Sequence, residues 1–329
     1  MTSQKPKALI KVKTLFFYFA VLVMSTLSGL RVFGYDRDYF SYLRFYEKVS
    51  LAIEFKGRFE PGFQLFAKFT KVFIDPDSFG LFLFITAFVS LYLKLSILKN
   101  AKHYILLVTI YFMLIFPLHE MMQIRISMAS GIMYWTLNKS LTSTVNIWIK
   151  SLLVCVGISF HYSAIILAPF ILNPGLCNSR SKLWITAVMI CPILLINAGM
   201  GLISKLIPIV DLYINQINLL EEVDINPYSS RNIIFVTVSI IGLVNIKHIS
   251  KDMLPWFYLS LLGLSLWYSF IWFPVFAHRL LELTVFSYLV WVPSLPGYSK
   301  FVSLSLLLIL AVYFLIRTLV IAPMFSSVV

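Results

Sequence analysis

The sequence predicts an all-α, polytopic integral membrane protein, a helical bundle of about 10–11 transmembrane helices. Of its 329 residues, 60% are hydrophobic and only 12% are charged, whereas soluble domains carry roughly a quarter charged residues. Apolar runs long enough to cross a bilayer follow one another along the chain, among them 14–30, 79–98, 104–118, 183–204 and 299–320. Because little chain is left between them, we expect one transmembrane domain over residues 1–329.

The positive charge of the chain indicates membrane topology rather than nucleic-acid binding. The net charge is +13, but the 27 Lys and Arg residues are spread through short loops, as topology signals and contacts to lipid headgroups are. Cys155, Cys177 and Cys191 have no CxxC spacing and lie in or beside apolar segments. We therefore predict no disulfide framework, no metal site and no cofactor.

The first helix, 14–30, sets the orientation of the chain. Four Lys precede it and no small-residue cleavage site follows, so it should remain uncleaved with its basic end in the cytoplasm. Residues 31–76 then form an extracytoplasmic loop. Within that loop the segment "PGFQLFAKFTKVF" predicts a helix lying in the membrane interface, with one face formed by Phe63, Phe66, Phe69 and Phe73.

The remaining bundle is expected over residues 77–320. Helix 79–98 should return to an inner cluster of Lys94, Lys99, Lys102 and His103. Helix 104–118 should lead out again to a polar loop with Glu120, Gln123 and Arg125.

The apolar run 151–172 is interrupted by "SFHYS" and allows two topologies. It is either one helix or two short segments that turn at His161. The second alternative places the basic loop 178–182 inside and the acidic second loop, 206–230, outside, as the charge rule favours. His161 would then face the outer side.

Ionisable residues at membrane depth are costly, so each is a candidate for function. The predicted topology places the candidates on the outer side of the bilayer: Arg31, Asp36, Arg37, Asp38, Arg58, Glu60, Glu120, Arg125, His161, Arg279 and Glu282.

The two arginines that begin or interrupt apolar helices have two interpretations each. Arg125 precedes a run of small residues and could bind an anion such as phosphate, or could reach to the lipid headgroups while the small residues pack helices. Arg279 could bind a ligand, or could form a salt bridge with Glu282, which lies three residues further on.

The acidic residues and His161 also have more than one interpretation each. His161 is a catalytic base or a hydrogen-bonded core residue. Asp36 and Asp38 form a DxD pair that could bind a divalent cation, supply a base, or pair with neighbouring arginines. Glu60 precedes Pro61 and Gly62, where it could act in catalysis or stabilise the start of a helix.

Five segments occur in an order that carries a family likeness: "GYDRDYFSYLRFYE", "FEPGFQLFAKF", "QIRISMASGIMYWTL", "SFHYSAIILAPF" and "FAHRLLELTVF". Over residues 14–295 the chain resembles the EpsG-type exopolysaccharide polymerases, which are close in character to the Wzy O-antigen polymerases. By matching positions, the resemblance implies functional weight on Gly34, Asp36, Tyr39, Glu60, Pro61, Arg125, Ala129, His161, Ser163 and Arg279.

The resemblance implies a GT-C-like bundle with a polar cavity open to the outer side of the bacterial plasma (inner) membrane. It implies a polymerase of O-antigen, capsule or exopolysaccharide repeats. The implied partners are undecaprenyl-diphosphate-linked oligosaccharide as donor and acceptor, membrane lipids and, as a further candidate, a chain-length regulator protein; nucleic acid is not among them.

The residues fit an inverting, metal-independent transfer. Arg125, Arg279 and Arg31 would bind the diphosphate, since guanidinium groups match phosphate oxygens. His161 is the first candidate for the base, with Asp36 and Glu60 as alternatives. Gly34, Tyr39, Pro61, Ala129 and Ser163 would shape the cavity. Two other functions remain open: a polyprenyl-phosphate-sugar glycosyltransferase or ligase that uses Asp36 and Asp38, and a flippase or transporter of lipid-linked sugar.

Overall fold

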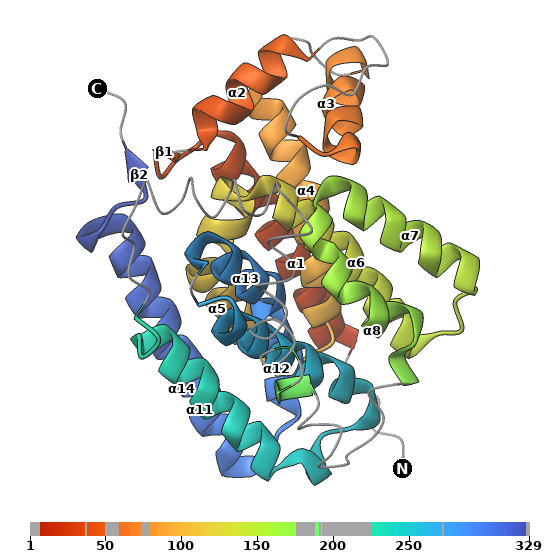
Figure 1. Ribbon diagram of the computed structural model, residues 1–329, viewed down its shortest axis with the longest axis vertical. Helices are drawn as coiled ribbons and strands as arrows, with labels where there is room; N and C mark the ends of the chain where they lie inside the picture. The colour runs from red at the N-terminus through yellow and green to blue at the C-terminus, as the bar shows by residue number, and fades with distance from the viewer. Residues whose placement is uncertain are drawn as a thin grey trace, which may run out of the picture. The chain divides into compact units, whose positions relative to one another are not determined.

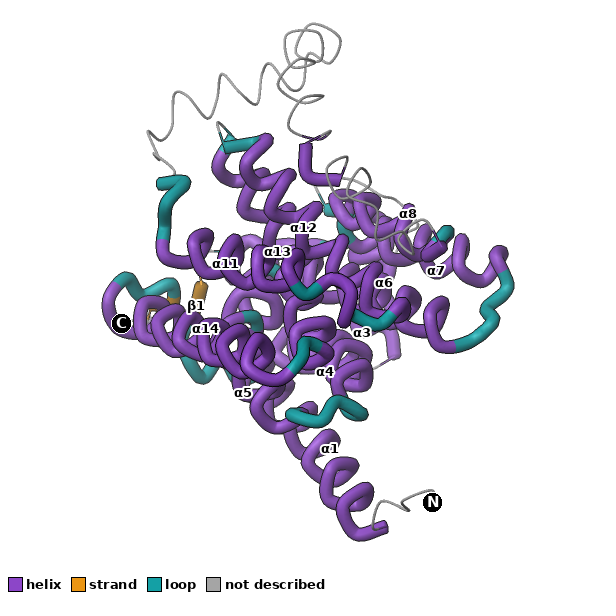
Figure 2. The backbone as a smooth tube through the Cα atoms, turned by 90° about the horizontal axis from the view of Figure 1, so that it is seen from below, coloured by secondary structure: helices purple, strands orange, loops and turns teal. Residues whose placement is uncertain are grey.

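The protein is helical over nearly all of the chain that the computed structural model describes (Figures 1 and 2). The described residues are 7–36, 38–49, 59–73, 79–175, 188–190, 192, 226–271 and 273–326. Within them, three helices are long and apolar enough to cross a membrane: Val12–Gly29, Phe79–Leu98 and Gly297–Ile321. The predicted all-helical, multi-pass membrane class is confirmed at this level, whereas the full helix count stays a prediction.

Two compact units make up the chain. The first comprises residues 1–174 and 307–329, and the second comprises residues 175–306. The predicted helix 183–204 and most of the predicted second outer loop, 206–230, lie outside the described residues. The expectation of one transmembrane domain therefore stays a prediction.

The first unit is built on apolar helices that pack in sequence order. Helix α4 lies against both α1 and α6, and α6 lies against α7. Because lipid is as apolar as these helices, they associate through close van der Waals packing and interhelical hydrogen bonds rather than through the hydrophobic effect. The helices of this core are α1 (Lys7–Gly29), α4 (Phe79–Leu98), α5 (Tyr104–Leu114), a π-helix (Pro117–Met122), α6 (Ile124–Thr142) and α7 (Ile147–Phe160).

The prediction of a polar loop around Glu120 is wrong. Residues 117–122 form a π-helix, and the side chains of His119 and Glu120 are 1% and 0% exposed. Lys94, expected in a basic cluster at the inner end of its helix, is also fully buried. The reason is that these groups bond to one another between α4 and the π-helix, an arrangement that hydropathy along the chain does not reveal.

The segment predicted as the first outer loop contains helices α2 (Tyr39–Lys48) and α3 (Pro61–Phe73). The helix predicted for this segment is present as α3, and its position in the membrane interface stays a prediction. Its four phenylalanines do not share one environment. Phe63 is fully buried against the rings of Tyr42, Phe45 and Phe82. The exposed face is still apolar, as an interfacial helix requires, and consists of Leu65, Phe69, Val72 and Phe73.

The helix break predicted at His161 is present. Helix α7 ends at Phe160, His161 is extended with φ −160° and ψ 118°, and a 3₁₀-helix (Tyr162–Leu167) leads into α8 (Ala168–Leu172). The topology that we derived from this break stays a prediction.

The last described strand returns to the segment that follows α1. Helix α14 (Gly297–Ile316) continues into a π-helix (Arg317–Ile321) and then into strand β2 (Phe325–Ser326), which pairs antiparallel with β1 (Tyr35–Asp36). Phe325 also lies against Phe33, with ring centroids 6.2 Å apart. This pairing joins the last described residues to the segment that follows α1.

The second unit contains a tightly packed helix pair. Helices α12 (Leu254–Ser269) and α13 (Pro274–Trp291) lie along each other and bury Trp256, Trp267 and Trp291 completely. Helix α11 (Ser230–Val244) packs on α12. Short 3₁₀-helices join or end these elements at Ile246–His248, Lys251–Met253 and Val292–Ser294.

Candidate functional site

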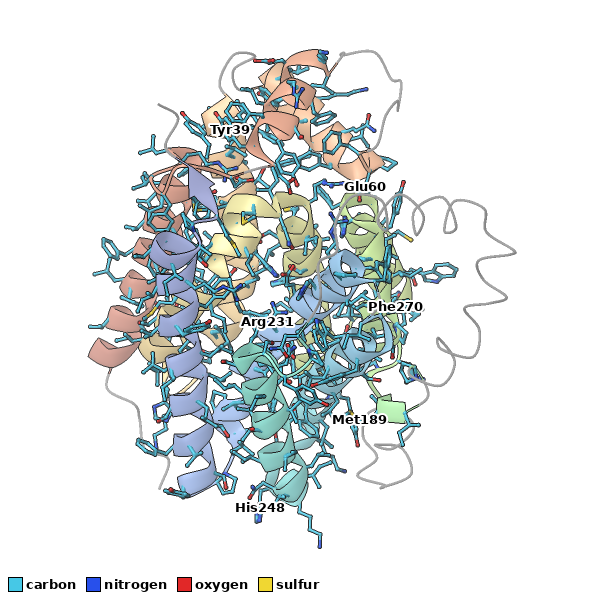
Figure 3. All side chains as sticks on the ribbon, turned by 60° about the vertical axis from the view of Figure 1, so that its left-hand side comes forward. Tyr39, Glu60, Met189, Arg231, His248 and Phe270 are labelled. Carbon is cyan, nitrogen blue, oxygen red and sulfur yellow. The ribbon has the colours of Figure 1, made fainter. Side chains whose placement is uncertain are left out.

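Three of the predicted site residues meet at the helix ends of the first unit. The Glu60 carboxylate places Oε1 2.7 Å from Nδ1 of His161, and its Oε2 accepts a hydrogen bond from Nη1 of Arg125. Glu60 and His161 are 4% and 7% exposed. With Tyr42, described below, these residues form what we call the Glu60 cluster, and Figure 3 marks Glu60 at the start of α3.

The "EPGF" motif explains how Glu60 reaches His161. Pro61 is the first residue of α3, where its fixed φ suits a helix start. Gly62 lies so close to the last turn of α7 that a Cβ there would be 2.2 Å from Oγ of Ser159. The missing side chain lets α3 begin beside the residue that precedes Phe160 and His161. Glu60 therefore bonds to side chains of other helices, beyond the helix-start role that the sequence left open.

Aromatic side chains hold Arg125 in place. Its guanidinium carbon lies 5.9 Å from the ring centroid of Tyr42 and 5.0 Å from that of Phe59, and its Nε donates to the Tyr42 hydroxyl at 3.5 Å. The Arg125 side chain remains 15% exposed. Sequence reasoning missed Tyr42, because a tyrosine in an amphipathic segment is usually a core residue; its place within "GYDRDYFSYLRFYE" was the available signal.

The electrostatics of the cluster keep Glu60 ionised. Burial raises the pKa of Glu60, but the hydrogen bond from His161 and the charge of Arg125 outweigh it, so the pKa lies below its usual value. The ionised carboxylate accepts a hydrogen bond from Nδ1 of His161 when that nitrogen carries a proton. In the neutral form of such a ring, the lone pair is on Nε2. Burial raises the pKa of Tyr42 against the effect of Arg125, so its hydroxyl stays protonated.

A second predicted pair, Arg31 and Asp36, forms a separate contact in the first loop. Arg31 Nη1 lies 3.1 Å from Asp36 Oδ2 and also donates to the carbonyl oxygen of Met121. Burial lowers the pKa of Arg31 and raises that of Asp36, in each case against the attraction of the partner. Nε and Nη2 of Arg31 are buried and have no hydrogen-bond partner in the described part of the chain.

The backbone around Arg31 is a tight turn with positive φ. Arg31 has φ 50° and Gly34 has φ 101°, and the amide of Gly34 donates to the Arg31 carbonyl at 2.8 Å. Only glycine adopts φ near 100° without strain, which accounts for Gly34 in the motif. Tyr39 then begins α2, with its ring 5.4 Å from the Arg31 guanidinium carbon.

The DxD pair has the geometry of a turn. Oδ2 of Asp36 bonds to Arg31, and Oδ1 accepts from the amide of Asp38 at 2.9 Å. Among the residues with described positions, no group of three or more His, Cys, Asp or Glu side chains could hold a metal ion.

The other predicted residues fall into two places. Ala129 is fully buried in α6, and Oγ of Ser163 is buried with no hydrogen-bond partner within the described ranges. Arg279 belongs to the second unit, in the second turn of α13. Its neighbour His278 places Nδ1 2.6 Å from Nη2 of Arg231, a basic residue of α11 that sequence reasoning did not select (Figure 3).

Comparison with known proteins gives one finding. The model of the EpsG family matches residues 14–327, nearly the whole chain, which confirms the resemblance and extends it through the last helix. No curated protein and no solved structure matches the chain significantly.

Proposed function

The chain belongs to the EpsG family, and we propose that it is a polymerase of bacterial polysaccharide repeats that acts on lipid-linked substrates. Family membership indicates a polymerase type of function in exopolysaccharide synthesis. In the finer form proposed here, the enzyme transfers a growing glycan from undecaprenyl diphosphate to the next lipid-linked repeat. The reaction takes place in a GT-C-like cavity on the extracytoplasmic face of the plasma membrane.

The observation that carries the proposal is the Glu60 cluster. Glycosyl transfer from a lipid diphosphate needs a base for the acceptor hydroxyl and cationic donors for the leaving diphosphate. His161 and Arg125 supply these two groups, and one carboxylate, that of Glu60, bonds to both. Side chains 65 and 101 residues distant from Glu60 are thus held beside each other.

Each side chain has one role in the transfer. An acceptor hydroxyl oxygen attacks the anomeric carbon of the donor sugar, while the bond from that carbon to the diphosphate oxygen breaks. The hydroxyl proton passes to Nε2 of His161, and the diphosphate leaves on its lipid carrier. Because attack and departure occur on opposite faces of the anomeric carbon, the configuration inverts.

Glu60 is a positioning residue in this scheme. Its carboxylate fixes the tautomer of His161 and stabilises the imidazolium that forms on proton transfer, as the acidic member of a triad does. It also orients the guanidinium of Arg125, whose remaining N–H groups bind a phosphate oxygen.

Arg31 is proposed as a further diphosphate ligand, and the same role for Arg279, in the second unit, stays a prediction. The two buried nitrogens of Arg31 that lack a partner in the described chain, Nε and Nη2, support this role, since buried donors normally have one. Asp36 orients Arg31 through the contact at 3.1 Å. In this mechanism the arginines supply the positive charge at the diphosphate, and no metal takes part.

Reconstitution tests the proposal directly. Purified protein in liposomes with a lipid-linked repeat unit should produce a ladder of chain lengths, and EDTA should leave the ladder unchanged. Arg125→Ala and His161→Ala should each yield single repeats only. Lys139→Ala removes a charge from the exposed far end of the same helix and should leave the ladder intact.

Two results would overturn the proposal. A full ladder from Arg125→Ala at equal protein level would exclude the assigned diphosphate ligand. Loss of transfer on adding EDTA would favour a metal-dependent polyprenyl-phosphate-sugar glycosyltransferase or ligase.

A further inference from the structure

A second ionic group lies buried inside the first unit. Nζ of Lys94 in α4 is 2.9 Å from Oε1 of Glu120 in the π-helix, and both side chains are 0% exposed. Polar side chains from neighbouring elements surround them. This group, which we call the Lys94 cluster, consists of Ser90, Lys94, Tyr111, His119, Glu120 and Ser127.

The hydrogen bonds of the cluster fix its geometry closely. Nζ of Lys94 has three polar neighbours, with Ser127 Oγ at 3.0 Å and His119 Nδ1 at 3.2 Å in addition to Glu120. Oε1 of Glu120 also accepts from the Tyr111 hydroxyl at 2.6 Å and from Ser127 Oγ at 2.7 Å. The three N–H donors of the ammonium group are therefore matched by three acceptors.

Stability alone does not explain such a group. Replacing a buried ion pair with apolar residues of similar volume is often neutral or stabilising, and ionisable groups at membrane depth are costly. Oε2 of Glu120 is moreover buried with no hydrogen-bond partner among the described residues. The buried Lys94–Glu120 pair is costly, and directional hydrogen bonds hold it in place. We take this to mean that the pair serves to fix the relative positions of the helices that carry it.

The same π-helix connects this cluster to two arginines of the proposed site. The carbonyl oxygen of Glu120 accepts from Ser28 Oγ at 2.7 Å, and the carbonyl oxygen of Met121 accepts from Arg31. Only Gln123 separates the π-helix from α6, whose first turn carries Arg125. Ser127, the next polar residue of that turn, is bonded to Lys94 and Glu120.

We propose that Lys94 and Glu120 are positioning residues that set the spacing of Arg31 and Arg125 for a lipid diphosphate. Their bonds hold the π-helix against α4 and the start of α6. They thereby fix the position of the Met121 carbonyl oxygen that accepts from Arg31, and the orientation of the Arg125 side chain. This inference rests on the proposed function, because the diphosphate site is the one proposed above.

The test compares diphosphate binding with folding. Inorganic pyrophosphate is the probe, and its effect on the unfolding temperature of purified full-length protein is titrated. The variants are Lys94→Met, Glu120→Gln and the double variant Lys94→Met/Glu120→Gln, which removes both charges. Thr86→Val is the control, since Thr86 is buried in the same helix and its hydroxyl donates to the carbonyl oxygen of Phe82, outside the Lys94 cluster.

The double variant gives the decisive result. We expect its unfolding temperature to recover most of the loss in the single variants, because no charge is left unpaired. Its half-saturating pyrophosphate concentration should remain at least about tenfold above that of the wild type, since small displacements of binding groups are costly. Thr86→Val should bind as the wild type does.

The outcomes separate the two proposals. If the double variant regains both its unfolding temperature and its pyrophosphate affinity, or if the single variants bind normally, Lys94 and Glu120 have a structural role only and the inference is wrong. If the wild type itself shows no response to pyrophosphate, the diphosphate site of the proposed function fails and the inference fails with it.

Discussion

The Glu60 and Lys94 clusters each join a carboxylate to a basic side chain of a neighbouring helix, and both include residues of α6. They differ in where they lie. The Glu60 cluster is at the helix ends, and its Arg125 side chain is 15% exposed, whereas Lys94 and Glu120 are 0% exposed within the helices. A ligand can reach the first cluster without unfolding the protein, but it cannot reach the second. Accessibility thus separates the substrate contacts proposed for Arg125 from the positioning roles proposed for Lys94 and Glu120.

The largest expected effect is on stability, from Glu120→Ala. This change leaves the Lys94 ammonium buried without its counter-charge, which should lower the free energy of unfolding by about 3–5 kcal/mol. Glu60→Ala should cost clearly less, because Arg125 and His161 lie at the helix ends where water can solvate them. Denaturant titration of both variants in the same detergent measures the difference. Equal losses would mean that accessibility does not distinguish the clusters.

The next effect is on rate, from Arg125→Lys. Lysine keeps the positive charge but cannot donate to Glu60 and Tyr42 while presenting further N–H groups to a phosphate in one plane. We expect transfer to slow by about 10²–10³-fold, the usual cost of losing one oriented donor to a developing negative charge. Initial rates of polymerisation in liposomes measure it, with Lys139→Arg on the same helix as the control. A lysine variant with normal rates would show that charge alone suffices at this position.

The sequence predicted more of the Glu60 cluster than of the Lys94 cluster. It selected Glu60, Arg125 and His161 individually, because charge and a helix break stand out in an apolar chain. It did not pair them, since the pairing depends on the approach of α3 to the end of α7 at Gly62. It placed Lys94 in a basic cluster at the inner end of its helix and Glu120 in an outer loop. Hydropathy places a charged residue at a helix end by default, and only the packing of α4 against α6 reveals that both are interior.

A smaller effect, on the pH dependence of stability, is expected from Glu60→Gln. The folded-state pKa of Glu60 lies below the unfolded value near 4.5, so its ionised form stabilises the fold. That contribution is complete above about pH 4.5 and is lost as the pH falls through the folded-state pKa. The free energy of unfolding of the wild type should therefore exceed that of the variant by about 2 kcal/mol at neutral pH, which is typical of hydrogen bonds to a charged group. The difference should become progressively smaller in acid.

Chemical unfolding at a series of pH values measures this difference. Gln64→Ala changes an uncharged neighbour on the same helix, so its destabilisation should stay constant over the same pH range. A Glu60→Gln difference that grows on acidification would contradict the assigned direction of the pKa.

The smallest effect is expected from Asn146→Ala, at the end of α7 remote from His161. The Asn146 side chain accepts from the amide of Trp148 at 2.9 Å and so caps the helix, and its loss should cost about 1 kcal/mol. Because the bonds of Glu60 lie at the opposite end of α7, the rate of transfer should not change. Unfolding free energy and polymerisation rate are measured on the same preparation. A fall in rate as large as that of Arg125→Lys would show that the Glu60 cluster responds to any loss of stability in α7, and its separation from purely structural groups would then fail.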